Sequence, residues 1–255
     1  MKKLLGFLLL IVCSSNINAQ DSLRSTMTGE EVALLFRNEA EGGLTLHSGG
    51  FGISFKRGWH KTGYKKRMLD MDLVSLRHPK QYKQPNPYYP DSRPFFFGKM
   101  NYVYMLRAGY GMQNILFGKG ERSGVEVRFN YYFGGNLGIT KPVYLEVLLD
   151  SQFDSLFKVV EVRQYDPEDP LMQSVENIYG PGPYFQGFDQ MKFHPGVYAK
   201  FALSFEYSMW QHKVTALETG ITLDYFPKAI PIMAYNKNEN LYVNFFITLL
   251  WGAKW

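Results

Sequence analysis

The C-terminal segment 241–255 constrains the fold more than any other part of the chain, because it alternates over most of its length. One set of alternate residues is entirely apolar: Val243, Phe245, Ile247, Leu249 and Trp251. The other set is mixed and consists of Asn244, Phe246, Thr248 and Leu250. Successive side chains of a β-strand point to opposite faces, so the segment predicts a strand with one apolar and one mixed face. A long apolar edge strand in water promotes aggregation, whereas a closed barrel in a bilayer has no free edge, so we expect a membrane barrel.

Residues 1–19 have the features of a secretory signal peptide and are set apart from the fold. Lys2 and Lys3 form a basic start, residues 4–12 form an apolar core too short to span a bilayer as a helix, and Ala19 precedes the cleavage site. An uncleaved membrane anchor and lipidation at Cys13 are the alternatives. Cleavage after Ala19 removes the single cysteine, so we expect no disulfide bond in the exported protein.

The composition is typical of a transmembrane barrel. The chain has 18 Tyr, 20 Phe, 4 Trp and 24 Gly, and no uninterrupted apolar stretch of 18 residues follows the signal peptide. Helical membrane spans are therefore not expected, whereas barrel strands are half polar and rich in aromatic residues. A secreted soluble β-sandwich has a similar composition and stays open as the alternative fold.

Alternating polarity predicts eight strands, at about 50–60, 64–77, 100–114, 123–134, 138–150, 196–210, 213–226 and 241–255. The expected fold is an all-β, antiparallel transmembrane β-barrel over residues 50–255, with long loops at 78–98 and 151–195. Residues 20–49 form an N-terminal segment that could add a hairpin, which would make ten strands. The glycine doublets at 42–43, 49–50 and 134–135 are expected to be turns.

The sidedness of the loops follows from the last strand, because known barrels of this kind have short periplasmic turns, long outer loops and a periplasmic C-terminus. This places 226–240 and 150–195 outside, and 210–213 and 134–141 in the periplasm. The segment Arg77–Lys99, with five prolines, then falls on the periplasmic side and breaks the rule. Either one strand is miscounted or the protein has an unusual inner loop.

The mixed faces of the predicted strands carry charges of both signs. An unpaired buried charge is costly, so we expect these side chains to pair in a narrow lumen. The predicted lumen network is Asp70, Asp72, Arg107, Glu126, Arg128, Glu146, Lys200, Glu206, Glu218 and Asp224. Asp70 and Asp72 could instead form an acid pair.

Three features carry a resemblance to a known class of proteins: a Lys-Lys signal that ends in Asn18-Ala19-Gln20, alternating Tyr/Phe/Gly strands and a terminal aromatic strand. In these features the chain resembles Gram-negative outer-membrane β-barrel proteins, above all the small barrels of Bacteroidetes. The resemblance covers nearly the whole mature chain. It implies an outer-membrane location, contact with lipid and lipopolysaccharide, and recognition by the barrel-insertion machinery. The corresponding C-terminal insertion signal is Phe245, Ile247, Leu249, Trp251 and Trp255, with Trp where the family usually has a terminal Phe. Some small barrels of that group accompany the type IX secretion machinery, which the chain matches in size and style.

No catalytic, cofactor or metal site is predicted. The five histidines are His47, His60, His78, His194 and His212, and none has a second His or Cys at ligand spacing. Ser204 with His194, or Ser208 with His212, could be proposed as catalytic pairs, but closeness along the chain does not make a triad. The acidic run 166–170 lacks the twelve-residue pattern of a calcium loop.

Two basic or aromatic segments are candidates for binding. The turn that carries Lys56, Arg57, Lys61, Lys65, Lys66 and Arg67 is predicted outside, where it could contact lipopolysaccharide phosphates or simply be solvated. The proline-rich loop carries Lys80, Tyr82, Lys83, Tyr88, Tyr89 and Arg93. An extended Pro/Tyr segment is a known docking style, so this loop could bind a periplasmic or secretion-complex protein, or could pack on its own rim.

The expected function is that of a non-enzymatic structural or adaptor barrel that docks envelope or secretion partners through its loops. An eight-stranded barrel is filled by its own side chains, so an open pore is not expected. A narrow channel or small-ligand transporter is the alternative if the barrel has ten strands, and a barrel enzyme acting on lipid is a third. No nucleic-acid partner is expected.

Overall fold

The computed structural model describes residues 36–119, 124–150, 158–208, 210 and 212–255, so the predicted signal peptide lies outside the described residues. Two short 3-10 helices, η1 (Pro170–Met172) and η2 (Val175–Asn177), lie between the strands β7 (Lys158–Gln164) and β8 (Ile178–Pro181). No helix in the described ranges is long and apolar enough to cross a membrane. The strands are β1 (Asn38–His47), β2 (Gly50–Thr62), β3 (Lys65–Leu76), β4 (Asn101–Phe117), β5 (Glu126–Pro142), β6 (Tyr144–Asp150), β7 (Lys158–Gln164), β8 (Ile178–Pro181), β9 (Lys192–Glu206), β10 (Lys213–Tyr225) and β11 (Leu241–Lys254), with η1 at Pro170–Met172 and η2 at Val175–Asn177.

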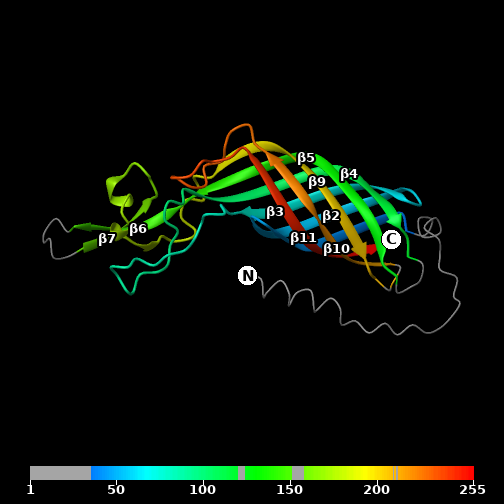
Figure 1. Ribbon diagram of the computed structural model, residues 1–255, viewed down its shortest axis with the longest axis horizontal. Helices are drawn as coiled ribbons and strands as arrows, with labels where there is room; N and C mark the ends of the chain where they lie inside the picture. The colour runs from blue at the N-terminus through cyan, green and yellow to red at the C-terminus, as the bar shows by residue number, and fades with distance from the viewer. Residues whose placement is uncertain (1–35, 120–123, 151–157, 209, 211) are drawn as a thin grey trace.

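Eight strands close into one antiparallel barrel in the order β1-β11-β10-β9-β5-β4-β3-β2 (Figure 1). The last strand pairs with the first, with Leu249 opposite Leu44. At the end of this seam Asn38 and Trp255 exchange backbone hydrogen bonds of 2.9 and 3.0 Å. The predicted all-β, eight-stranded antiparallel barrel is confirmed, and the strand 241–255 completes its closure.

The barrel has two different ends. The terminal rim contains Asn38 and Trp255, together with the ends of the strands that short connections join: β2 to β3, β4 to β5 and β9 to β10. The loop rim, at the other end, contains the turn 48–49 and the long segments 77–100, 143–191 and 226–240. The predicted sidedness of Arg77–Lys99 was wrong, because the single barrel strand β5 had been counted as two strands when the sidedness was worked back from the C-terminus. This loop lies at the same end as the other long loops.

Two errors in the predicted strands cancel and leave the number eight. Residues 38–47 are a barrel strand, so the barrel begins at Asn38 and not at Gly50. Gly134 and Gly135 lie inside the continuous strand β5, so the predicted strands 123–134 and 138–150 are one barrel strand followed by a strand outside the barrel. Gly134 faces Gly109 of β4, and a Cβ there would lie 2.1 Å from the Ala108 carbonyl oxygen. The doublet therefore permits close strand packing and not a turn, and Gly42 and Gly43 likewise lie inside β1.

A second sheet, with strand order β7-β6-β8, projects from the loop rim (Figure 1). Its apolar core contains Val143, Leu145, Val147, Tyr165, Met172 and Ile178, together with Phe95 from the segment 77–100. Asn86 of the same segment donates hydrogen bonds from Nδ2 to the carbonyl oxygens of Val175 (2.9 Å), Glu176 (3.2 Å) and Ile178 (2.7 Å). Segment 77–100 and this sheet therefore fold together, and we call them the loop-rim unit.

The outward face of the barrel is apolar on all eight strands. Exposed side chains on it include Leu44, Leu46, Ile53, Phe55, Met71, Leu73, Leu106, Tyr110, Phe133, Phe201, Leu203, Ile221, Tyr225, Phe245, Ile247 and Leu249. All four tryptophans, Trp59, Trp210, Trp251 and Trp255, are exposed toward the terminal rim. The inward face is polar along most of the barrel, which is the reverse of a soluble barrel.

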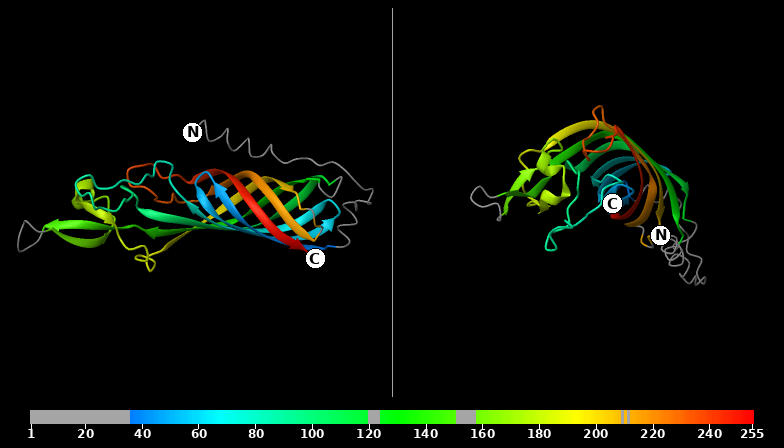
Figure 2. Two further views of the ribbon diagram at one scale, coloured as in Figure 1. Left: turned by 90° about the horizontal axis from the view of Figure 1, so that it is seen from below. Right: turned by 60° about the vertical axis from the view of Figure 1, so that its left-hand side comes forward.

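At the loop rim the interior changes from polar to apolar. Phe226, Ile230, Ile232 and Met233 of the segment 226–240 form one buried cluster with Val74, Leu76, Val103 and Met105 of β3 and β4. This apolar cap lies inside the mouth of the barrel, between the polar interior and the loop-rim unit. Figure 2 shows the barrel from the side and obliquely toward its loop end.

Candidate functional site

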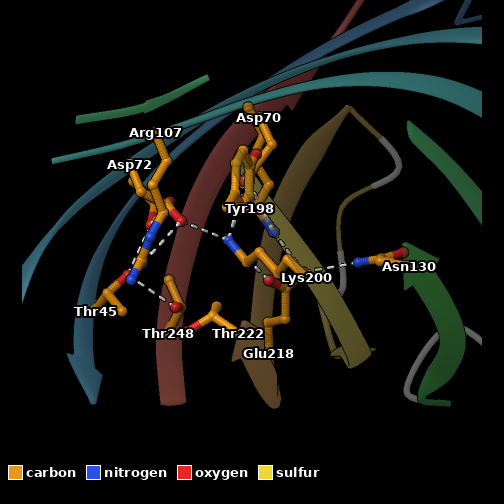
Figure 3. Close-up of polar contacts among 12 residues, drawn as sticks. Thr45, Asp70, Asp72, Arg107, Asn130, Tyr198, Lys200, Glu218, Thr222 and Thr248 are labelled. Carbon is orange, nitrogen blue, oxygen red and sulfur yellow. Dashed lines mark hydrogen bonds and ion pairs between the residues drawn. The ribbon is translucent and has the colours of Figure 1, made fainter. Parts of the chain in front are cut away.

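The polar interior is the most distinctive site of the molecule, because charged side chains from opposite walls meet there. Lys200 of β9 lies 3.1 Å from Asp70 Oδ1 and 2.9 Å from Asp72 Oδ2, both on β3 (Figure 3). Lys56 of β2 pairs with Glu218 of β10. Strand alternation places all of these side chains inside, since their chain neighbours form the apolar outer face.

A second crossing joins β4 to β10. The Arg107 guanidinium donates from Nε to Asp224 Oδ1 (2.8 Å) and from Nη2 to Asp224 Oδ2 (2.6 Å). The same carboxylate accepts a 2.9 Å hydrogen bond from Asn136 Nδ2. Such a bidentate pair has directional preference as well as charge, so it fixes the relative position of the two walls.

Neutral polar side chains complete the central network. Ser54 Oγ donates to Asp72 (2.5 Å), and Thr45 Oγ1 lies 2.6 Å from Ser54 Oγ and 2.9 Å from Thr248 Oγ1. Tyr198 Oη donates to Asp70 (3.1 Å), in space that Gly109 leaves open because a Cβ there would lie 2.2 Å from this hydroxyl. Buried charges are tolerated when their remaining hydrogen-bonding positions are occupied in this way.

A further group of charges lies toward the terminal rim. Lys66 pairs with Glu39 (2.5 Å), and Lys254 lies 2.8 Å from Glu206. Arg128 contacts Glu126 (2.5 Å), Glu41 (3.7 Å) and Glu206. Among the described residues, the polar interior therefore holds paired cations and carboxylates both at its centre and toward the terminal rim.

The structure brings together every residue of the predicted lumen network except Glu146. That residue lies on β6, outside the barrel, where it accepts a 2.6 Å hydrogen bond from Arg93. The interior residues missing from the predicted network include Glu39, Glu41, Thr45, Ser54, Lys56, Lys66, Gln113, Asn136 and Lys254. Alternation would have identified Ser54 and Lys56, which alternate with the apolar Ile53 and Phe55.

The predicted lipopolysaccharide contact is wrong in two respects. Lys56 and Lys66 are buried in the interior and paired with acids. Arg57, Lys61, Lys65 and Arg67 are exposed but lie at the terminal rim, at the opposite end from the long loops. Arg57 packs its guanidinium on the rings of Trp59 (5.7 Å) and Trp255 (5.8 Å). The error in sidedness follows from counting the single barrel strand β5 as two strands.

The catalytic pairs considered from the sequence are not assembled. Ser204 is buried opposite Glu218, whereas His194 lies ten residues away on the same extended strand, near Thr140 Oγ1 (3.2 Å) at the loop rim. Ser208 Oγ donates to the carbonyl oxygen of Trp210, and the Trp210 ring lies 6.0 Å from that of His212. Within the described ranges, no group of three or more His, Cys, Asp or Glu side chains could hold a metal ion.

The predicted docking residues lie in the loop-rim unit in two kinds of environment. Tyr82 and Tyr88 are among the most exposed aromatic side chains, at 68% and 63%. Arg93 is tied to Glu146 and to the carbonyl oxygen of Pro181 (3.1 Å). Tyr89 packs edge-on against Tyr179, Lys83 lies over Phe96, and Lys80 is exposed.

No family model and no curated protein matches the sequence. Among solved structures, Neisserial surface protein A matches with a TM-score of 0.40 at 10% identity, over 86% of this chain and 96% of the other. Ail, the attachment invasion locus protein of Yersinia pestis, gives 0.40 at 9% identity over 86% and 97%, in a complex with the heparin analogue sucrose octasulfate. The outer membrane protein OprG from Pseudomonas aeruginosa gives 0.35 at 10% identity over 86% and 95%. With TM-scores of 0.40 or less, the similarity to these structures carries no argument, and the fold assignment rests on the strand pairing described above.

Proposed function

We propose that the chain is an outer-membrane barrel that is closed to ions and presents the loop-rim unit to a partner. The apolar outer face and the charged interior are the arrangement that a bilayer requires of a barrel, because lipid surrounds the outside and side chains pair within. The four tryptophans near the terminal rim fit an interfacial aromatic belt. Short connections at the terminal rim and long ones at the loop rim match periplasmic and external ends respectively.

The observation that carries the closed-barrel proposal is that two successive barriers fill the lumen. The paired charges occupy its polar length, and the apolar cap of Phe226, Ile230, Ile232 and Met233 occupies its mouth. A selective channel requires a wetted path with sites that bind ions weakly, and neither barrier provides one. An adaptor role is therefore favoured over the narrow channel.

The loop-rim unit supports the adaptor role because it is a folded surface and not a set of loose loops. Its own core and the Asn86 hydrogen bonds hold the segment 77–100 in place, so Tyr82 and Tyr88 are presented without a large ordering cost. Exposed aromatic residues on a preformed surface are typical anchors of protein interfaces. Partners of the cell envelope, secretion components among them, would meet this surface outside the membrane.

Two measurements test the proposal. Purified protein in planar bilayers should show no conductance steps, and regular steps would favour the channel instead. A photo-crosslinking amino acid at Tyr82 or Tyr88 in living cells should capture a defined protein, whereas one at Tyr64, an exposed tyrosine at the terminal rim, should not capture it. The same products at all three positions, or none at Tyr82 and Tyr88, would contradict the docking role.

Membrane integration needs its own control. The protein should stay in the membrane fraction after high-salt extraction and should migrate differently on gels before and after heating, as folded barrels do. Release by salt alone would mean that the apolar outer face does not contact lipid.

A further inference from the structure

A separate cavity of about 620 Å³ opens at the loop rim, outside the polar interior. It lies between the end of β3, the start of β4, the end of β5 and the segment that follows β8. This volume is in the range of small-ligand sites, and the walls come from both the barrel and the loop-rim unit. Neither the lumen network nor the docking tyrosines Tyr82 and Tyr88 line it.

Four of the five cationic side chains that line the cavity have no acidic partner among the described residues. Arg77, Lys83, Lys99 and Lys141 all contribute to its wall. Within the described part of the chain, no carboxylate lies within 4.0 Å of any of these four cationic groups. The fifth lining cation, Arg93, pairs with Glu146. The polar interior pairs its cations with acids, so the four unpaired cations are a local feature of the cavity.

Lys99 is the central group of this arrangement. It is 2% exposed, and its ammonium group donates to Gln81 Oε1 (2.8 Å) and faces the rings of Tyr102 (4.1 Å) and Phe96 (4.7 Å). Burial, followed by the nearby charges of Arg77 and Lys83, lowers the pKa of Lys99 to about 7. A buried ammonium without an acid is costly, so a bound anion would relieve the cost.

Lys141 faces the same space from β5. Its ammonium lies 5.3 Å from the centre of the Tyr102 ring and 4.5 Å from that of Tyr184, and it donates to the carbonyl oxygens of Tyr184 and Gln186 (3.3 Å). Two ammonium groups therefore share one aromatic ring. Both lysines also line the cavity, so a ligand held there meets two cationic groups.

The rest of the wall is aromatic and neutral. Tyr104 Oη lies 2.6 Å from Tyr184 Oη, and the Phe96 and Tyr102 rings are half-buried beside the cations. Flat rings pack against the apolar faces of sugar rings, while hydroxyl and amide groups such as those of Ser75 and Gln81 can bond to sugar hydroxyls. The lining is thus suited to a polar ring that carries an anionic substituent.

We propose that this cavity binds the phosphate or sulfate ester of a sugar, with Lys99 and Lys141 on the ester oxygens and Tyr102, Tyr104 and Tyr184 around the ring. Charge-assisted hydrogen bonds to lysine are a common way of holding such oxyanions. The ester can be carried by a free glycan or by the headgroup of a glycolipid, since the loop rim lies next to the outward apolar face. The docking anchors Tyr82 and Tyr88 do not line the cavity, although Lys83 and Arg93 of the predicted docking set do, so the two roles are tested separately.

The test is titration calorimetry on the full-length folded protein in detergent, with glucose 6-phosphate, glucose 6-sulfate, glucose and inorganic phosphate as probes. The two esters should bind, glucose should not, and inorganic phosphate should bind more weakly. Lys99→Met and Lys141→Met should each weaken ester binding about tenfold or more. Lys228→Met, which removes an exposed cation of the same loop rim outside the cavity, should leave binding unchanged.

Equal binding of glucose and its esters, or unchanged ester binding in both lysine variants, would overturn the proposal. Heat-dependent gel mobility verifies that each variant folds. If a buried-lysine variant does not fold, Lys83→Met, at the exposed wall of the cavity, replaces it. Lys83→Met should bind the esters more weakly, and unchanged binding would overturn the assignment. Two further titrations, with vesicles that contain phosphorylated lipid A and with its deacylated oligosaccharide, separate the sources. Binding of both indicates recognition of the ester itself, and binding of the vesicles alone assigns the site to a lipid headgroup.

Discussion

Arg107 on β4 and Asp224 on β10 form a two-point hydrogen-bonded ion pair across the barrel, although neither strand is the other's neighbour in the sheet. Both side chains are almost completely buried. The pair therefore connects opposite walls of the lumen and contributes to filling it. Its removal should show how far the charged interior supports the fold.

Arg107→Met should lower the free energy of unfolding by about 3–5 kcal/mol, because it leaves the Asp224 carboxylate buried with less compensation. Urea unfolding in lipid vesicles measures the change. Arg163→Met is the matched control, since Arg163 pairs with Glu161 on the exposed strand β7 and its loss should change the free energy of unfolding far less. Equal effects of the two substitutions would mean that the interior pair is not a specific support.

The double variant Arg107→Met/Asp224→Leu should recover much of the lost stability. Removing both members of a buried pair avoids the unpaired charge, and apolar replacements of similar volume are often neutral or stabilising. The same unfolding measurement applies. A double variant that is as unstable as the two single changes added together would show that the two residues act independently.

The lipid-facing side of the last strand can be tested with one charge. Ile247→Arg should destabilise the folded protein by about 2–4 kcal/mol if Ile247 lies near the middle of the bilayer. Val159→Arg is the control, because Val159 is equally exposed but lies on β7, outside the barrel. If both variants were fully stable in vesicles, the outward face could not be in contact with lipid.

Ester binding at the loop-rim cavity should weaken as the pH rises. Lys99 has its pKa lowered to about 7 in the free protein, so it loses its charge above that pH and affinity for glucose 6-sulfate should fall by up to about tenfold per pH unit. The sulfate ester keeps its charge over this range. The other charged or titratable groups around Lys99 are Arg77, Lys83, Lys141, Tyr102, Tyr104, Tyr184 and the Arg93–Glu146 pair.

Lys99→Arg separates the titration of Lys99 from the titration of the other groups around the cavity, because arginine stays protonated over the whole pH range of the experiment. This variant should bind the sulfate ester with a nearly flat pH profile between pH 6 and 9. Calorimetry at several pH values measures both profiles. A profile in Lys99→Arg as steep as that of the unchanged protein would assign the pH dependence to another group.

The attachment of the segment 77–100 depends on one amide. Asn86→Ala removes three hydrogen bonds to backbone carbonyl oxygens of η2 and β8, so limited proteolysis should cut this segment faster than in the unchanged protein. Asn236→Ala, in the neighbouring segment 226–240, controls for a general effect of losing an asparagine. Cleavage at the same rate in all three proteins would mean that the apolar contact of Phe95 is sufficient to hold the segment.

Local alternation predicted most barrel strands correctly, together with which of their side chains lie inside. Asp70, Asp72, Lys200 and Glu218 could be assigned to the interior because their chain neighbours are apolar. The partners within that interior could not be predicted, since Lys56 meets Glu218 across the barrel and not along the chain. The glycine pair 134–135 was misread as a turn because turns and closely packed strands both favour a residue without a Cβ.

The sequence by itself determined the class of fold, the antiparallel barrel and its two-faced strands, because the period of two is a local property of an extended backbone. Only the tertiary structure decided where the barrel begins, which end each loop occupies, and that residues 144–150 leave the barrel to build a separate sheet. A strand has the same alternation in either place. Pairing of β5 with β9 and of β1 with β11 is settled by long-range contacts. The cationic cavity depends on the pairing of β4 with β5, which sets Lys141 opposite Tyr102 and close to Lys99.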